Sequence, residues 1–263
     1  MNIRVLLMFY LLAIVLLSCQ KVISVDVGSS AAQLVIEGNL TDHQGTQTVT
    51  LSKSVPYGNA NVYPAVTGAT VTLNDNTNTT YRFTETQPGT YTINNFKGRA
   101  LIFYVLTVKA EGKTYYGGST MQFPTNLDSL TLISQTFGSK SVINVVVNYQ
   151  DPANIANQYR FVMYVNSVQV KQIFVENDQL SDGRSVSTTL YQHDIDLKKG
   201  DKVDVDMECI DGNMYNYWNS LSSQGGNTPQ NSATPSNPPS NILGGALGYF
   251  SAHTVQRKSI VIP

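Results

Sequence analysis

Charge and cysteine are what this sequence has least of. Charged residues occupy 13% of the 263 positions, about half of the roughly 25% that is typical of a soluble globular protein. The 17 Lys and Arg residues are balanced by 18 Asp and Glu residues, so the chain has no basic excess and we expect no nucleic-acid partner. Runs rich in Leu, Ala, Glu and Lys are scarce, which argues against a helical bundle or a coiled coil.

Motifs that carry catalysis or metal binding are also lacking. The three histidines form no H-x-x-H or H-E-x-x-H pair, and there is no C-x-x-C motif, so a zinc site has none of its usual spacings. The sequence contains no P-loop and no G-x-S-x-G motif, and no G-x-G-x-x-G opens a helix after a strand. We therefore predict a protein that is not an enzyme, with no catalytic residue, no metal site and no cofactor.

Two acidic regions leave alternatives open. His193 lies beside Asp194 and Asp196, which could bind a divalent cation, but the polar face of an edge strand is the simpler interpretation. Residues 176–178 (Glu-Asn-Asp) and Asp182 could offer oxygens to Ca²⁺. They lack the regular loop spacing of a dedicated site, so we favour a turn. An envelope hydrolase that cleaves glycan or peptide through Asp194 or Asp196 is the enzymatic alternative.

Small polar and β-branched residues take the place of the missing charge. The chain has 23 Ser, 25 Thr and 23 Asn residues, and its Thr, Val, Tyr and Ile residues, punctuated by Gly and Asn, favour β-structure. From residue 33 onward, apolar–polar alternations recur at intervals of roughly 8–12 residues, the spacing of β-sandwiches and barrels. The clearest lie at 34–40, 48–54, 103–110, 113–122 and 202–210. We predict a mainly all-β fold.

Residues 123–126 (Phe-Pro-Thr-Asn) interrupt the alternation and mark an expected domain boundary. We predict an immunoglobulin-like β-sandwich over 33–124 and a second β-rich, sandwich-like domain over 125–263, each of a normal domain size. The second domain is expected to contain one short helix near 211–223 and a long loop rich in Pro, Asn and Ser.

The expected helix carries most of the candidate binding residues. Met214, Trp218 and Leu221 are spaced i, i+4, i+7, which places them on one helix face and favours Trp218 as a packing residue. Aromatic side chains could alternatively form a stacking platform for a sugar or a peptide. The candidate ligand-binding residues are Tyr215, Tyr217, Trp218 and Tyr249.

The Pro-rich loop is expected over residues 225–241. This segment carries no charge and four prolines, and too little chain follows it for a further domain to fold alone. Residues 242–254 and 258–262 are predicted to be closing strands that return to the second domain.

The first 19 residues divide into three parts. Arg4 supplies a positive charge, an apolar run of 13 residues follows, and Leu16-Leu17-Ser18-Cys19 closes the segment. The run is too short for a span of ~20 residues but suits a signal-peptide core. The closing residues resemble the lipobox, in which the cysteine becomes the lipid-modified N-terminus. We predict a signal peptide over 1–18, palmitate on Cys19 and a tether over 19–32, with a short N-terminal anchor as the alternative.

Lipidation of Cys19 would leave the second cysteine without a partner. Cys209 shares the apolar face of an alternating segment with Val203, Val205 and Met207. Nothing basic lies nearby in the sequence to lower the pKa of its thiol. We predict a buried, structural cysteine.

Several segments together resemble one protein family. They include Leu34-Val35-Ile36-Glu37-Gly38 and Pro88-Gly89-Thr90-Tyr91. The most specific part runs from Asn237-Pro238-Pro239-Ser240-Asn241 to Gly248-Tyr249-Phe250-Ser251-Ala252. The chain is similar, over essentially its whole mature length, to the lipoproteins of domain-of-unknown-function family 4249 from Bacteroidota-type Gram-negative bacteria. The resemblance implies an accessory lipoprotein of the outer membrane, often encoded beside a TonB-dependent receptor, and it implies no catalytic residues.

These observations lead to one functional hypothesis and two alternatives. We expect a non-enzymatic protein that is held in the outer membrane by the lipid on Cys19, on its periplasmic or its cell-surface face. It would act as an accessory binding component of a TonB-dependent uptake system, with the membrane and the receptor as partners. The alternatives are an envelope hydrolase and a purely structural envelope protein.

Overall fold

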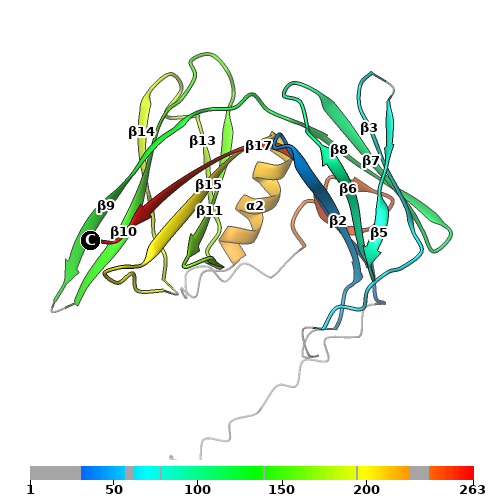
Figure 1. Cartoon of the computed structure of the whole chain (residues 1–263), viewed down its shortest axis with the longest axis horizontal. Helices are drawn as coiled ribbons and strands as arrows, with labels where there is room; N and C mark the ends of the chain where they lie inside the picture. The colour runs from blue at the N-terminus through cyan, green and yellow to red at the C-terminus, as the bar shows by residue number, and fades with distance from the viewer. Residues whose placement is uncertain (1–30, 57–61, 78, 139, 194, 225–236) are drawn as a thin grey trace, which may run out of the picture. The chain divides into compact units, whose positions relative to one another are not determined.

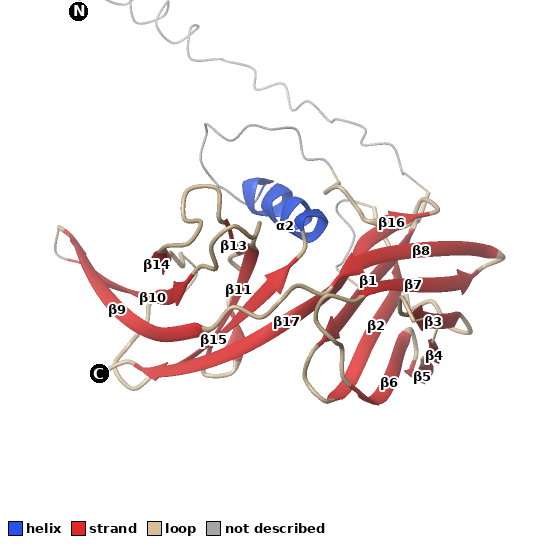
Figure 2. Cartoon of the chain, turned by 90° about the horizontal axis from the view of Figure 1, so that it is seen from above, coloured by secondary structure: helices blue, strands red, loops and turns tan. Residues whose placement is uncertain are grey.

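The computed structural model describes residues 31–56, 62–77, 79–138, 140–193, 195–224 and 237–263 (Figure 1). The predicted signal peptide over 1–18, Cys19 and most of the tether lie outside the described residues. Inside these ranges the chain is mainly β-structure with one helix, so the predicted all-β class is confirmed (Figure 2). Within them, no helix combines the length and the apolar character that a membrane span needs.

The strands lie close to where the alternations predict them. In chain order they are β1 (Leu34–Thr41), β2 (Gly45–Lys53), β3 (Thr70–Asn74), β4 (Thr80–Arg82), β5 (Thr84–Gln87), β6 (Thr90–Phe96), β7 (Phe103–Ala110), β8 (Lys113–Thr120), β9 (Leu127–Phe137), β10 (Lys140–Gln150), β11 (Gln158–Val165), β12 (Val168–Gln169), β13 (Phe174–Asn177), β14 (Ser185–Leu190), β15 (Lys202–Ile210), β16 (Ile242–Leu243) and β17 (Leu247–Val261). The helix α2 spans Gly212–Gln224.

These strands form three sheets. A nine-stranded sheet has the order β12-β11-β15-β17-β1-β2-β6-β5, with β13 also paired to β11. A five-stranded sheet has the order β16-β8-β7-β3-β4, and a three-stranded sheet the order β14-β10-β9. Strands from both halves of the sequence therefore share the largest sheet.

The last strand connects the two halves of that sheet. Residues 247–253 of β17 pair in parallel with β1, and residues 254–261 pair antiparallel with β15. Gly248 lies opposite Ile36 with a φ of 93°, and a Cβ atom at Gly248 would fall 2.0 Å from the carbonyl oxygen of Ile36. Only glycine therefore permits this close approach of the two strands.

The prediction of two closing strands over 242–254 and 258–262 is wrong. β16 has two residues and pairs with β8, while β17 is one continuous strand of 15 residues. Gly244 and Gly245 have φ angles of 106° and 87°, so the chain turns there and the first expected strand is split. Nor do these strands return only to the second half, because the first half of β17 pairs with β1.

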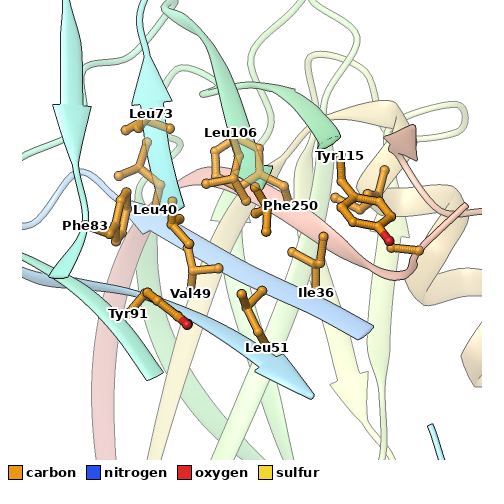
Figure 3. Close-up of a cluster of buried hydrophobic side chains, with 14 of the residues drawn as sticks. Ile36, Leu40, Val49, Leu51, Leu73, Phe83, Tyr91, Leu106, Tyr115 and Phe250 are labelled. Carbon is orange, nitrogen blue, oxygen red and sulfur yellow. The ribbon is translucent and has the colours of Figure 1, made fainter. Parts of the chain in front are cut away.

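A first hydrophobic core lies between the five-stranded sheet and part of the nine-stranded sheet. Ile36 and Leu40 of β1 alternate toward it, and Leu73 and Leu106 face them from β3 and β7 (Figure 3). Phe250 of β17 lies among these side chains. The boundary expected after residue 124 stays a prediction. This core nevertheless contains side chains from near the end of the chain, such as Phe250 and Ala252.

A second core contains the apolar faces of β10, β11 and β15. Val147 packs there with Phe161 and Met207, and Cys209 is buried among them with 2% of its surface exposed. Burial raises the pKa of the Cys209 thiol, which favours its protonated form. The predicted burial of this cysteine is confirmed.

Helix α2 begins beside the first core. Asp211 caps it, because its Oδ1 accepts a hydrogen bond from the backbone N–H of Met214 at 3.0 Å. The other carboxylate oxygen accepts bonds from Ser119 Oγ at 2.6 Å and from the N–H of Thr120 at 3.1 Å, both on β8. One carboxylate therefore starts the helix and joins it to the five-stranded sheet.

The described end of the Pro-rich loop is fixed by one side chain. Residues 225–236 of the loop expected over 225–241 lie outside the described residues. Asn241 Nδ2 donates to the carbonyl oxygens of Gly118 and Phe250, and Asn241 Oδ1 accepts from the N–H of Phe250 at 2.9 Å. The Asn241 side chain therefore supplies hydrogen-bond partners to main-chain groups of β8 and β17 that the strand pairing leaves without one.

Candidate functional site

A cleft of about 820 Å³ lies on one face of the nine-stranded sheet. Its walls come from β1, β11, β15 and β17, from residues 169–173 and from Trp218 of α2. This volume is within the range of clefts that hold small ligands, roughly 300–1,000 Å³. The cleft is therefore the candidate functional site.

The alternation of β15 gives the cleft its acidic groups. Val203, Val205 and Met207 point into the second core, so Asp206 and Glu208 point to the opposite face, where they line the cleft. Both carboxylates are largely buried, with 11% of each side chain exposed. Buried carboxylates need charged or hydrogen-bonding partners, and the neighbouring strands provide them.

Asp206 is paired with the arginine directly opposite on β17. In the ladder Asp206 faces Arg257, and both carboxylate oxygens accept hydrogen bonds from its guanidinium group, one from Nε and one from an Nη atom. The hydrogen bonds to Asp206 raise the pKa of Arg257. The guanidinium also lies 5.2 Å from the ring centroid of Tyr164, which holds it over the cleft wall.

Glu208 is paired with the arginine opposite on β11. Arg160 Nη1 donates to Glu208 Oε2 at 2.9 Å, and its guanidinium carbon lies 3.8 Å from the ring centroid of Trp218. Trp218 is therefore held by a cation–π contact as well as by helix packing. A carboxylate, a guanidinium and an indole face are thus stacked in one row along the cleft.

The candidate aromatic residues separate into two groups. Trp218 and Tyr249 line the cleft with their ring centroids 5.0 Å apart. Tyr217 packs against both rings, each centroid at 5.1 Å, but does not line the cleft. Tyr215 is directed elsewhere and accepts a hydrogen bond from Asn177 Nδ2 at 3.0 Å. The binding role of all four stays a prediction.

His253 lies at the base of the cleft beside Glu208. Burial lowers the pKa of His253, against the opposing effect of the Glu208 carboxylate, so the imidazole is neutral near pH 7. Its Nε2 lies 3.7 Å from Glu208 Oε1, and its Nδ1 lies 2.8 Å from Ser251 Oγ. Ser251 is buried and does not line the cleft. The hydroxyl that contacts His253 is therefore not accessible to a ligand in the cleft.

The charged residues of the cleft could not be recognised from the sequence. Asp206 and Glu208 belong to a visible alternation, but Arg160 and Arg257 come from other strands. Their pairing depends on strand register, for which local sequence carries no signal. His193 and Asp196 are exposed and do not line the cleft, and Asp194 lies outside the described residues.

In chemical terms the cleft offers stacking faces and fixed charges. Trp218 and Tyr249 supply the faces, and Arg160, Arg257 and Lys171 supply three cations against two carboxylates. The arginine–carboxylate pairs hold the donors in place before a ligand arrives, which reduces the entropy lost on binding. A polar ligand with one apolar face fits this set of groups.

The comparisons with known proteins concern the family and the fold. The model of a family described as "Domain of unknown function (DUF4249)" matches residues 20–259. No match is found among curated proteins. Among solved structures, a segment of two fibronectin type-III domains from chicken tenascin is similar to 69% of this chain and 92% of that chain, with 14% identity and a TM-score of 0.22.

Proposed function

The chain belongs to the DUF4249 family, and we propose that it is a lipid-anchored, non-enzymatic binding protein of the bacterial cell envelope. In this proposal the lipid on Cys19 holds it in the outer membrane of a Bacteroidota-type bacterium. There it serves a TonB-dependent uptake system as an accessory component that captures a ligand. The observation that carries the proposal is the cleft, with aromatic faces and preorganised charges on a rigid sheet.

The chemistry of the cleft supports a saccharide or a short peptide as ligand. Both present hydrogen-bonding groups for Arg160 and Arg257, and both have a flat or apolar side that can lie on Trp218. The charges on the cleft wall nearly balance, which favours polar ligands over strongly charged ones.

The ligand class can be tested with the only tryptophan of the chain as a probe. Trp218 lines the cleft, so its fluorescence should change in a saturable way when the mature protein is titrated with defined oligosaccharides and oligopeptides. Trp218→Ala should weaken binding by about tenfold in calorimetry, which corresponds to the loss of about 1.4 kcal/mol of stacking.

Tyr116→Ala is the matched control for this test. Tyr116 is also a partly exposed aromatic residue, but it does not line this cleft. Its replacement should leave the affinity within about twofold. The proposal is wrong for both ligand classes when no oligosaccharide or oligopeptide gives a saturable signal. It is also wrong when Trp218→Ala and the wild type bind equally well.

The anchor and the uptake role need a separate experiment in cells. Cys19→Ala should leave the precursor unprocessed and without labelled palmitate. The wild-type protein, cross-linked in membranes, should co-purify with a TonB-dependent receptor, and the Cys19→Ala protein should not. The hydrolase alternative is favoured instead when a bound oligosaccharide or peptide is converted to a shorter product.

A further inference from the structure

Three loops at the edge of the second core bring three carboxylates together. Asp151 follows β10, Asp178 follows β13, and Asp182 lies in the turn that leads to β14. One oxygen from each lies within 4.8 Å of the other two. From sequence, Asp178 and Asp182 lack the regular loop spacing of a calcium site and favour a turn. Asp151, which is far away in the sequence, joins them only in the fold.

This spacing allows one ion to contact all three residues. Ca²⁺ binds oxygen at roughly 2.3–2.6 Å, so two of its ligands lie at most about 5 Å apart. The separation in the cluster, within 4.8 Å, satisfies that limit. Carboxylate oxygens are also the ligand type that this hard cation prefers.

Within the described residues, hydrogen bonds but no ion pairs compensate the charge of the cluster. Asp151 is 1% exposed and Asp178 is 8% exposed. Among the described residues, no Lys, Arg or His forms an ion pair with Asp151, Asp178 or Asp182, although ion pairs do hold the acidic groups of the cleft. Buried carboxylates at such short range repel one another unless a cation or a proton neutralises them.

An independent observation comes from Asn157, which is 4% exposed. Its main chain is bonded twice to Asp178: the Asn157 N–H donates to Asp178 Oδ2 at 2.7 Å, and the Asp178 N–H donates to the Asn157 carbonyl at 3.2 Å. The side-chain oxygen of Asn157 is buried without a hydrogen-bond partner. An unpaired buried amide oxygen is costly. Because the main chain of Asn157 is bonded to Asp178, this oxygen belongs to a residue that adjoins the cluster, and a metal ion there would satisfy it.

The surrounding groups hold the carboxylates in place. Tyr159 donates its hydroxyl to Asp151 Oδ1 at 2.6 Å, and the N–H of Gly183 donates to Asp151 Oδ2 at 3.2 Å. The N–H of Asn154 donates to Asp182 Oδ1 at 2.7 Å. These bonds orient the cluster from outside, as partners of metal ligands commonly do.

We propose that Asp151, Asp178 and Asp182, with Asn157 Oδ1, form a Ca²⁺ site. The site closes the three loops against one another at the edge of the second core. It is separate from the cleft, so it goes beyond the proposed ligand-binding function. Metal-binding domains outside the cell commonly bind Ca²⁺ with dissociation constants of roughly 10⁻⁴–10⁻³ M, and we expect this range or tighter.

The test is calorimetric titration of the mature protein with CaCl₂, together with thermal unfolding in EGTA and in excess Ca²⁺. One Ca²⁺ per chain should bind, and saturation should raise the unfolding midpoint by about 5 °C. Asp182→Asn should weaken binding at least tenfold. Asp182 is exposed and Asn can still accept the bond from Asn154, so this variant is expected to fold.

Asp178→Asn is the second variant, and Asp128→Asn is the matched control. Asp128 is an exposed carboxylate on β9 outside the cluster, so its replacement should leave the calcium affinity within twofold. The proposal is overturned when the wild type shows no saturable Ca²⁺ binding, or when Asp182→Asn binds as the wild type does. Equal binding of Mg²⁺ would overturn the assignment to Ca²⁺.

Discussion

Two groups of acidic side chains in the second half of the chain differ in how their charge is compensated. In the cleft, Asp206 and Glu208 each face an arginine on the neighbouring strand. In the loop cluster, Asp151, Asp178 and Asp182 lie close to one another, and no ion pair joins them to a cationic side chain of the described residues. Both groups contain buried carboxylates, so the difference lies in the partners rather than in the burial.

The two groups show that strands and loops place charged residues next to different partners. A ladder places residues of neighbouring strands opposite one another, so a pair such as Glu208 and Arg160 is complete within the fold. Loops that follow different strands can bring like charges together at one edge. The cleft therefore has its charge balanced before any ligand arrives, whereas the loop cluster depends on something from outside the chain.

The largest effect is expected when a cleft pair is broken. Arg160→Ala leaves Glu208 buried and unpaired, so we expect the free energy of unfolding to fall by about 3–5 kcal/mol in urea denaturation. Arg257→Ala should cost less, because 53% of the Arg257 side chain is exposed and water can replace it.

A double variant tests whether Arg160→Ala loses stability because it leaves the Glu208 carboxylate buried without a partner. Arg160→Met combined with Glu208→Leu removes both charges and keeps apolar bulk, so it should be clearly more stable than Arg160→Ala. Equal stability of the two proteins would mean that the pair does not compensate a buried charge. The contrast between the cleft and the loop cluster would then be lost.

A smaller effect is expected at Asp211, which is compensated in a third way. Its carboxylate has the helix N-terminus, Ser119 and Thr120 as partners instead of a cation. Asp211→Ala should lower the free energy of unfolding by about 2 kcal/mol, through the lost cap and the unsatisfied donors. Asp211→Asn can still cap the helix and should lose less, and a larger loss for Asn than for Ala would contradict the hydrogen-bond argument.

Local patterns predicted the elements whose structure depends on near neighbours. The alternation over 202–210 gave β15 and its two faces, and the spacing of Met214 and Trp218 gave α2 within one residue at each end. The alternations over 103–110 and 113–122 likewise gave β7 and β8, which a hairpin turn at Glu111 and Gly112 connects.

Features that join distant segments could not be predicted in this way. β17 continues through the polar residues 256–259 because acidic residues of β15 lie opposite them: Asp206 pairs with Arg257, and Asp204 with Ser259. Only the register of the two strands reveals these partners. Asp151 meets Asp178 and Asp182 because three loops end at one edge, although 27 positions separate Asp151 from Asp178. The residues of both sites can be read in the sequence, but which of them lie next to one another depends on strand register and loop positions.

The smallest effect concerns the pH dependence of the cleft. His253 faces Glu208, Arg160, Asp42 and Asp206, and burial lowers its pKa below the ordinary 6.5. The unfolded chain therefore takes up a proton first as the pH falls. The contribution of neutral His253 to the free energy of unfolding is complete above pH 6.5, the ordinary pKa of histidine. It is lost as the pH falls from 6.5 to the lower pKa of His253 in the folded state, with a slope of at most about 1.4 kcal/mol per pH unit.

His253→Gln should remove this slope between pH 7.5 and 5.5, as measured by urea denaturation at several pH values. Carboxylates whose pKa is lowered by hydrogen bonds, such as Asp75 and Asp204, contribute in a separate window, because their stabilisation is lost only as the pH falls below about 4. A slope that persists in His253→Gln would place the proton uptake elsewhere. A slope that disappears would assign the proton uptake to His253, whose burial in the cleft wall keeps the imidazole uncharged in the folded protein.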